Sequence, residues 1–452
     1  MEPNQSFQDL NLNTPLYNAL ADLGFERPTP IQAEAFNIVA SGRDVVGIAQ
    51  TGTGKTYAYM LPILRHLKYS RQENPRVLIL VPTRELVVQV VDDINKLAAY
   101  INIRVLGVYG GTNINTQKQA VAQGQDIIVA TPGRLFDLAV SRVLQLKSIQ
   151  KLVIDEVDVM LDLGFRHQLL NIFDVLPKRM QHIMFSATMT QDVDELITNF
   201  FVKPERITIA VSGTPLHNIK QKRYDVANFY TKINLLEHLL QDRDKFNKIL
   251  IFVAFKKMAD KLFEELEQHF PDECCIIHSN KTQNYRLRSI EDFRAGNSRI
   301  LIATDVMARG LDIENISHVI NFDTPHYPEN YMHRIGRTGR AEQQGNALTL
   351  STEKEKEAIA QIEAYMGMKI ESIGFPTDVD ISKELIAEER PQIKERNNPS
   401  KRRFDDVGEA FHEKKDKNKK ENQGGSYRTK IAAKYKKPKT RGDKNYNKKR
   451  RK

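Results

Sequence analysis

Short apolar runs alternate with amphipathic stretches twice along the chain. Stretches such as 84–100 and 113–123 place apolar residues at helical spacing. This alternation is typical of an open parallel sheet with helices on both faces, and continuous apolar runs indicate strands buried on both sides. In the first half we predict strands at Val45–Ile48, Val77–Val81, Val105–Tyr109, Ile127–Ala130, Leu152–Ile154 and His182–Phe185.

A second series of runs follows, and between the two series residues 211–220 are small, polar and interrupted by Pro215, as in a linker. We therefore predict two tandem α/β domains, each a doubly wound parallel sheet, at 1–210 and 221–375. Ligands of such sheets bind beyond the carboxyl ends of the strands. Strands of the second domain are predicted at Ile249–Phe252, Cys275–His278, Ile300–Ala303, Val319–Asn321 and Ala347–Leu350.

The bulk composition agrees with two or three domains, since 452 residues with 40% hydrophobic and 27% charged positions are ordinary for a soluble protein. The sequence has no apolar run long enough to span a membrane, and its start lacks a signal-peptide pattern. The adjacent Cys274 and Cys275 lie in an apolar run and are interpreted as buried strand thiols. These features predict a cytoplasmic protein without a membrane partner.

The net charge of +10 is concentrated at the end of the chain. Residues 391–452 hold 23 Lys or Arg against 8 Asp or Glu, a balance of +15, so the other 390 residues carry −5. With little apolar periodicity here, we predict a disordered basic tail over 376–452. Such a tail is either a solubilising segment or a tether to nucleic-acid phosphates, and Tyr427, Tyr435 and Tyr446 favour the tether.

Two short motifs predict a nucleoside triphosphate site with Mg²⁺. The first contains Gly52, Gly54, Lys55 and Thr56, directly between a predicted strand and a predicted helix. The glycines let backbone amides approach phosphates, the lysine adds a charge, and the threonine hydroxyl suits Mg²⁺. Ala49 stands where the usual phosphate loop has glycine.

The second motif is an acid cluster after the predicted strand at 152–154. On their own, Asp155, Glu156 and Asp158 would more often cap a helix or face solvent than bind a metal. The preceding phosphate loop favours the metal. Asp155 would then hold Mg²⁺ with Thr56, Glu156 would orient or deprotonate the attacking water, and Asp158 would link this loop to other motifs.

Three arginines separated by glycines follow in the second half, at Arg334, Arg337 and Arg340. Arginine suits forked contact with phosphate. Arginines from a half without its own phosphate loop would reach a γ-phosphate held by the first half. The alternative is a salt-bridged surface loop.

Together with further motifs over 7–350, this pattern resembles the DEAD-box RNA helicases, ATP-dependent enzymes of superfamily 2, and among them the compact bacterial, RhlE-like group. The resemblance implies two RecA-like domains and an RNA-dependent ATPase that bends and locally unwinds RNA duplexes or remodels ribonucleoproteins. It also implies a monomer that binds single-stranded RNA and short duplexes. Ribosomal particles and the RNA-decay machinery are candidate partners.

The resemblance assigns the ATP site as well. Phe25 would stack on adenine, Gln32 would read its edge, and Asp312 would reach the ribose. Arg337 and Arg340 would act as arginine fingers. The implied ATP-binding residues are Phe25, Arg27, Gln32, Thr51, Gly52, Thr53, Gly54, Lys55, Thr56 and Asp312, and the implied catalytic residues are Lys55, Asp155, Glu156, Arg337 and Arg340. The residues that would couple hydrolysis to strand separation are Asp158, Ser186, Thr188 and His333.

The implied RNA contacts are amides, hydroxyls and arginines at strand ends, without an aromatic platform. Such a set grips phosphate and sugar without reading sequence, and contacts to the 2′-hydroxyl favour RNA. In the first domain they are Pro82, Thr83, Arg84, Gly111, Thr131, Gly133 and Arg134, and in the second Gln283, Arg286 and Thr304.

Two places depart from the family pattern. Residue 157 is Val where the family name has Ala, and we expect its side chain to face away from the chemistry. The loop at 253–257 lacks the commoner Asn-Thr pair, which leaves its RNA contact open. Two other functions compete with an RNA helicase: a DNA helicase or translocase, and an ATP-gated RNA clamp or annealing chaperone in which the tail dominates.

Overall fold

The computed structural model of the chain describes residues 6–49, 52–209, 218–305, 313, 315–339 and 344–390. The predicted site residues Thr51, Asp312 and Arg340 lie outside these ranges, as do 211–217 of the predicted linker and the tail from residue 391. The described strands form two seven-stranded sheets in which every pairing is parallel, as predicted.

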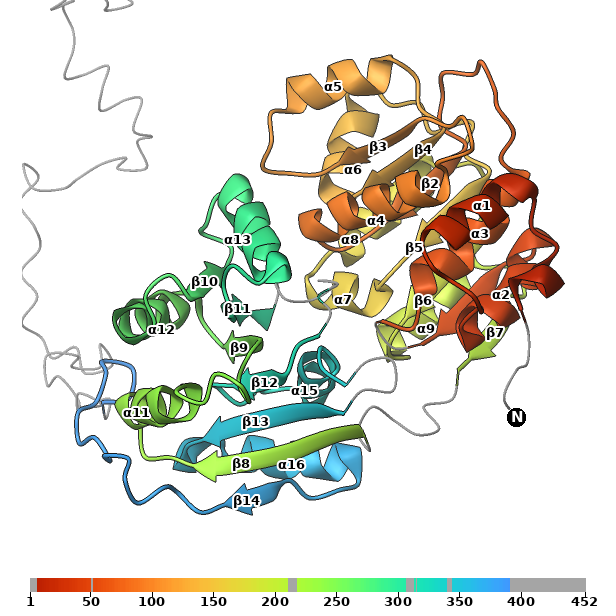
Figure 1. The fold of residues 1–452 in the computed structure, drawn as a ribbon. Helices are drawn as coiled ribbons and strands as arrows, with labels where there is room; N and C mark the ends of the chain where they lie inside the picture. Colours follow the sequence, from red (N-terminus) through yellow and green to blue (C-terminus); the bar gives the residue numbers. More distant parts are fainter. Residues whose placement is uncertain are drawn as a thin grey trace, which may run out of the picture. The chain divides into compact units, whose positions relative to one another are not determined.

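The first sheet has the strand order β3-β4-β2-β5-β6-β1-β7, with helices on both faces (Figure 1). The six predicted strands are confirmed to within a residue at either end, and β7 at one edge was not predicted. The strands are β1 (Val45–Ile48), β2 (Val77–Leu80), β3 (Val105–Val108), β4 (Ile127–Ala130), β5 (Lys151–Ile154), β6 (Gln181–Ser186) and β7 (Glu205–Thr208).

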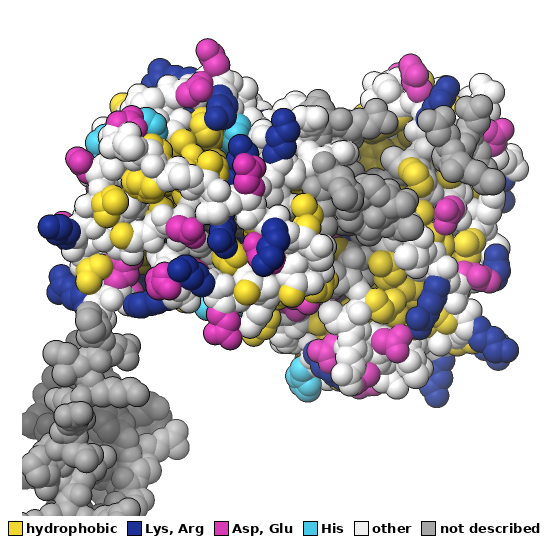
Figure 2. All heavy atoms as spheres, turned by 90° about the horizontal axis from the view of Figure 1, so that it is seen from below, with side chains coloured by type: hydrophobic (Ala, Val, Ile, Leu, Met, Phe, Trp, Pro, Cys, Tyr) yellow, Lys and Arg dark blue, Asp and Glu magenta, His cyan; other side chains and the backbone are white. Residues whose placement is uncertain are grey.

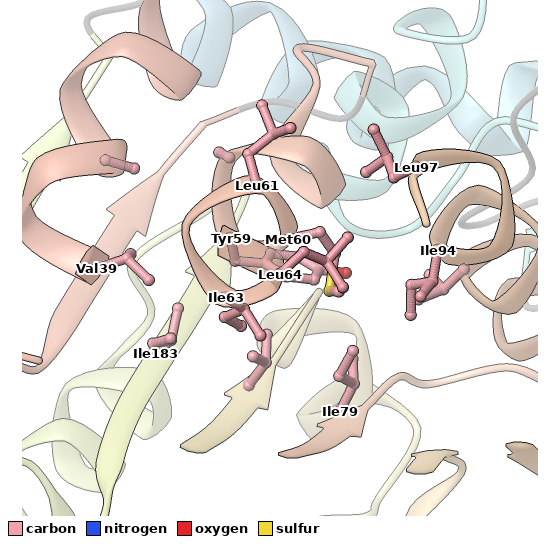
Figure 3. Close-up of a cluster of buried hydrophobic side chains, with 14 of the residues drawn as sticks. Val39, Tyr59, Met60, Leu61, Ile63, Leu64, Ile79, Ile94, Leu97 and Ile183 are labelled. Carbon is pink, nitrogen blue, oxygen red and sulfur yellow. The ribbon is translucent and has the colours of Figure 1, made fainter. Parts of the chain in front are cut away.

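Two apolar clusters fill the space between this sheet and its helices. Figure 3 shows how α3 packs in one cluster, with Ile63 between Ile183 of β6 and Ile79 of β2. The helices are η1 (Phe7–Leu10), α1 (Thr14–Asp22), α2 (Pro30–Ala40), α3 (Lys55–His66), α4 (Arg84–Leu97), α5 (Ile114–Ala122), α6 (Pro132–Val140), α7 (Val157–Asp162), α8 (Arg166–Val175) and α9 (Gln191–Phe200).

The second sheet has the order β10-β11-β9-β12-β13-β8-β14 and confirms the five strands predicted for it. Cys274 and Cys275 lie buried in β10, as expected. The strands are β8 (Ile219–Asp225), β9 (Ile249–Val253), β10 (Cys274–Ile277), β11 (Ile300–Thr304), β12 (His318–Asn321), β13 (Gly345–Ser351) and β14 (Glu371–Ile373). The helices are α11 (Phe229–Leu240), α12 (Lys256–His269), α13 (Gln283–Ala295), α15 (Pro328–Ile335), η2 (Glu353–Glu355) and α16 (Lys356–Met366).

Two predicted boundaries are wrong. β8 begins at Ile219, so the predicted linker extends too far by two residues. Residues 376–390 are not part of a disordered tail: Val379 and Ile386 are buried in the core of the second domain, and Asn228 donates to the Ser382 carbonyl. The sequence did not reveal this packing, because the apolar positions over 376–390 are too sparse to show a periodicity.

Acidic and basic side chains are interspersed on the face of the molecule seen in Figure 2, with small groups of hydrophobic side chains between them. This distribution agrees with the sequence, in which the excess of positive charge lies beyond residue 390. Among the helices that the structure describes, none combines the length and the apolar character needed to cross a membrane.

Candidate functional site

The phosphate loop joins β1 to α3, as the motif predicts. Gly52 and Gly54 have φ angles of 82° and 86°, which favour glycine. A Cβ atom at Gly54 would lie 2.4 Å from Nε2 of Gln32, so the loop has no room for a side chain there. Lys55 begins α3, and its Nζ is buried without a hydrogen-bond partner among the described residues. An ammonium with free donors at a helix N-terminus suits a phosphate ligand.

The acid pair follows β5, which is separated from β1 only by β6. Asp155 accepts hydrogen bonds from the Tyr59 hydroxyl at 3.1 Å and from the Glu156 N–H at 3.0 Å. Glu156 has a φ of 53°, and one of its carboxylate oxygens is buried without a partner in the described part of the chain. A buried acid held in a rarely used backbone conformation is typical of a functional site.

Burial raises the pKa of both carboxyls above their ordinary values. The Lys55 charge opposes this rise for both acids, and Arg337 opposes it for Glu156. Asp155 and the Thr56 hydroxyl are hard oxygen donors that suit Mg²⁺, an ion that usually takes its other ligands from phosphate and water. The charge of such an ion would favour the ionised form of both acids.

Two residues that the sequence did not single out hold this site together. Tyr59 lies one turn after Lys55 on α3, and burial keeps its pKa well above the usual value, so its hydroxyl is the donor to Asp155. The Thr29 hydroxyl donates to the Thr53 carbonyl at 2.8 Å. The helical spacing from Lys55 was the available signal for Tyr59, whereas the only signal for Thr29 was its place between the predicted adenine-binding residues Arg27 and Gln32.

The predicted adenine-binding segment is attached to the phosphate loop through Gln32. Its Nε2 donates to the Gly54 carbonyl at 3.2 Å and its Oε1 accepts from the Thr29 N–H at 3.0 Å. Phe25 is 46% exposed and forms a T-shaped pair with Tyr57, while Arg27 is exposed. The adenine contacts of Phe25 and Gln32 stay predictions.

The structure brings together the four residues predicted to couple hydrolysis to strand separation. Oδ2 of Asp158 accepts from the N–H and the hydroxyl of Thr188, both at 3.0 Å, and lies 3.8 Å from Nε2 of His333. The Ser186 hydroxyl donates to the Thr188 carbonyl at 2.6 Å. Asp158 therefore joins the acid loop to a turn after β6 and to a helix of the second domain.

The three arginines of the second domain have different surroundings. Arg334 does not face a phosphate site: it is 2% exposed, pairs with Asp305, and donates to Asn321 and to the Asp323 carbonyl. Its role is to fix α15 to the sheet, which corrects the expectation that all three arginines reach a γ-phosphate. Arg337 is buried at the end of α15, and its charge acts on Glu156.

The residues predicted to contact RNA in the first domain lie just after the carboxyl ends of three neighbouring strands. Thr83 and Arg84 follow β2, Gly111 follows β3, and Thr131 follows β4. Gly111 has a φ of 81°, and a Cβ there would overlap the Arg84 guanidinium. The carboxyl ends of the strands therefore fall into two groups along the sheet. The ends of β3, β4 and β2 carry the predicted RNA contacts, including Pro82, Gly133 and Arg134. The ends of β5, β6 and β1 carry the acid pair, the turn with Ser186 and Thr188, and the phosphate loop.

In the second domain, Gln283 and Arg286 lie on the first two turns of α13, and Thr304 ends β11. Both α13 residues contact Glu85 of the first domain, a residue that the sequence analysis did not select. Gln283 Nε2 donates to Glu85 at 3.2 Å, and Arg286 Nη1 lies 3.2 Å from the same oxygen. The predicted RNA contacts of the two domains are therefore joined by a buried ion pair.

Val157, the departure from the family pattern, is fully buried in the apolar cluster beneath α7. Its side chain faces the core and not the acid pair, as expected. The loop at 253–257 contains an exposed aromatic ring, Phe255, at 65% exposure.

Comparison with known proteins was made on sequence and on structure. A family model described as DEAD/DEAH box helicase matches residues 29–196, and one described as helicase conserved C-terminal domain matches residues 231–342. The chain is 37% identical over 373 residues to DEAD-box ATP-dependent RNA helicase CshA of Bacillus subtilis (strain 168), covering 82% of this chain and 74% of that protein. It is 38% identical over 392 residues to RNA helicase CrhR of Synechocystis, covering 86% and 78%.

Similar solved structures include S. cerevisiae Dbp5 bound to RNA and ADP BeF3, with a TM-score of 0.75 and 31% identity over 82% of this chain and 96% of that one. The DEAD-box helicase Mss116 bound to ssRNA and UDP-BeF also has a TM-score of 0.75, with 27% identity over 83% of this chain and 81% of that one. Both proteins share the arrangement of two RecA-like parallel-sheet domains.

Proposed function

This chain belongs to the DEAD/DEAH box helicase family and is an ATP-dependent RNA helicase. We propose that, along the carboxyl ends of the strands in the first sheet, one half binds ATP and the other half binds RNA. The observation that carries this proposal is the strand order. Because β2 and β5 are neighbours, the end of the RNA-binding half touches the end of the ATP-binding half. A change at one ligand is thereby transmitted to the other over one strand spacing.

For hydrolysis, Lys55 would hold the β- and γ-phosphates, and Thr56 and Asp155 would hold Mg²⁺, whose charge would neutralise that of the phosphates. Glu156 orients or deprotonates the attacking water. The Lys55 ammonium and one Glu156 oxygen are buried and have no partner among the residues that the structure describes, which supports these roles, since buried polar atoms usually have partners. Arg337, with Arg340, stabilises the charge that develops on the transferred phosphoryl group.

For coupling, Asp158 links the acid loop to Ser186 and Thr188 in the first domain and to His333 in the second. We infer that domain closure assembles this network together with the Glu85 ion pair. The contacts that close the domains then depend on both ligands, so RNA tightens ATP binding as much as ATP tightens RNA binding.

For RNA, the first-domain strand ends and the second-domain residues Gln283, Arg286 and Thr304 grip the backbone of a bent single strand that a straight duplex does not match. Closure then separates a few base pairs. The basic tail adds phosphate contacts. A monomeric state, a cytoplasmic location, and ribosomal particles or RNA-decay machinery as partners complete the proposal.

The test measures ATP hydrolysis without nucleic acid, with single-stranded RNA, and with DNA of the same sequence. We expect stimulation by RNA alone. Lys55→Ala should lower the stimulated rate by about 10²-fold or more, because a charge that stabilises the transferring phosphate is lost. Equal hydrolysis with and without RNA would contradict the proposal, and equal stimulation by DNA would favour a DNA helicase.

A second measurement separates a helicase from a clamp or annealing chaperone. Unwinding of a short RNA duplex is compared between Lys55→Ala and a chain that ends at Arg390. Full remodelling by Lys55→Ala, with loss on truncation, would favour the clamp.

A further inference from the structure

A cavity of about 310 Å³ lies at the carboxyl ends of β9 and β12 in the second domain. Its walls are largely apolar, with Phe229, Phe255, Met258, Phe322 and Ile386 among the lining residues. Its volume is that of a small-ligand pocket, and the carboxyl edge of a parallel sheet is where such ligands bind. None of the residues assigned above to ATP, catalysis or RNA lines it.

A buried ion-pair cluster lies in the wall of this cavity. Lys232 lies 3.4 Å from Asp323 and 3.3 Å from Glu355. Burial would raise the pKa of Glu355, but Lys232 and the N–H groups of Thr352 and Thr324 outweigh it and hold that pKa below its usual value. The Thr324 hydroxyl, by contrast, is buried and has no hydrogen-bond partner in the described chain. Thr324 lines the cavity, but its hydroxyl oxygen is buried in the wall, so the space itself is bounded mainly by apolar side chains.

Phe255 is fixed at the rim of this cavity although its ring is 65% exposed. The preceding Ala254 N–H donates to Asp323 at 2.9 Å, and Phe255 itself is the N-cap residue of α12. The backbone beneath the ring is therefore tied to both β12 and α12. An exposed aromatic ring on a rigid base is suited to stacking with a flat ligand.

The cavity adjoins the path proposed for RNA. Thr304, a proposed RNA contact, pairs in register with Val253 on the adjacent strand, two residues before Phe255. Lys256 Nζ bonds to Asn280 at 2.9 Å, three residues before Gln283. Lys256 and Lys257 are both exposed and supply positive charge beside the ring.

We propose that Phe255 and the cavity behind it form an RNA-base subsite, in which one unpaired base of the bound strand stacks on the ring at the rim of the cavity. This inference rests on the proposed RNA path. A nucleobase fits the observations because it offers an aromatic face and no charge, while Lys256 and Lys257 meet the flanking phosphates. The subsite adds a base contact to a set of residues that otherwise grips the backbone.

The test compares equilibrium RNA affinity of the full chain and of Phe255→Ala, in the presence of a non-hydrolysable ATP analogue. The RNAs are a single strand long enough to cover both domains and the same strand with abasic sites along its length. We expect Phe255→Ala to weaken binding of the intact strand by about 5-fold or more, since stacking on one aromatic residue contributes on that scale. With the abasic strand, variant and wild type should bind equally.

Two further variants sharpen the result. Tyr69→Ala removes a ring of nearly the same exposure, 64%, ahead of β2 at the opposite end of the strands, and should leave RNA affinity unchanged. Phe255→Trp keeps an aromatic ring at this position and should retain most of the affinity.

Equal affinity of Phe255→Ala and wild type for the intact strand would overturn the subsite, as would an equal loss with both strands. Failure of the proposed function gives a different result: the wild-type chain would then show no binding that depends on the ATP analogue and no ATP hydrolysis stimulated by RNA.

Discussion

At the scale of single residues, the assignments depend on buried polar atoms without partners. Lys55 Nζ and one oxygen each of Glu156 and Asp158 are in this state among the described residues. Burial of such atoms is costly and is retained where a ligand completes them. The free-energy cost of burying such a group and its role in hydrolysis can be measured separately with a substitution that replaces one carboxylate oxygen by an amide nitrogen.

Glu156→Gln should retain ATP and RNA binding while turnover falls by about 10²-fold or more, because the metal ligand Asp155 remains and the group that handles water is lost. The measurement is single-turnover ATP hydrolysis alongside equilibrium binding of both ligands. Glu205→Gln, at an exposed ion pair with Arg43, is the matched control and should hydrolyse ATP normally. Unimpaired hydrolysis by Glu156→Gln would contradict the role of this carboxylate.

The same substitution should change stability in a pH-dependent way. Since burial raises the pKa of Glu156 above 4.5, the folded protein binds its proton more tightly than the unfolded chain does, and the free energy of unfolding falls as pH rises between the two values. At neutral pH, without nucleotide, Glu156→Gln should therefore be more stable than wild type by about 1 kcal/mol. Urea denaturation at several pH values checks this, and the difference should shrink as the pH falls toward 4.5.

At the scale of elements, strand order determines which motifs become neighbours. Motifs that are widely separated in sequence lie at the ends of adjacent strands. In addition, α13 of the second domain contacts Glu85 at the start of α4. This ion pair is buried, with side-chain exposures of 5% for Arg286 and 4% for Glu85. Breaking a buried pair from one side leaves an uncompensated charge, so it should favour the separated domains.

Glu85→Gln should reduce the coupling between the two ligands. We expect the ratio of ATP dissociation constants without and with RNA to fall by about 10-fold, a change of ordinary size for coupling between sites. ATP affinity in the absence of RNA should stay the same. Glu195→Gln, which changes an exposed ion pair with Arg166, is the control. An unchanged ratio would show that this contact does not contribute to closure.

At the scale of the whole molecule, the charge is divided between a slightly acidic folded part and a tail with a balance of +15. In the proposed function this division separates two tasks: the domains would supply specific geometry, and the tail would supply long-range attraction to phosphates.

Truncation after Arg390 should weaken RNA binding and flatten its salt dependence, because each phosphate contact contributes about 0.7 to the slope on single strands. The slope is measured from RNA affinity over a range of salt concentrations. A control chain keeps the length of the tail but replaces its Lys and Arg by Gln, and it should behave like the truncated protein. An identical slope before and after truncation would remove the tether from the proposal.

The sequence by itself determined the features that are local. Eleven strands could be placed because central strands of a parallel sheet are continuous apolar runs, and the phosphate loop and acid pair were recognisable because each lies at the end of such a run. The order of the motifs then identified the family. In the strands that were missed, polar residues replace the apolar run: β7 and β14 lie at sheet edges and β8, Ile219–Asp225, is largely polar.

Only the tertiary structure decided which residues meet across the chain. Tyr59 on Asp155, Gln32 on Gly54, Glu85 on Arg286 and Arg334 on Asp305 are contacts whose partners share no local pattern. The packing of 376–390 and the cavity beside Phe255 are of the same kind. Apolar periodicity reports which side of an element is buried, whereas the partner of a side chain depends on how the sheet orders its strands.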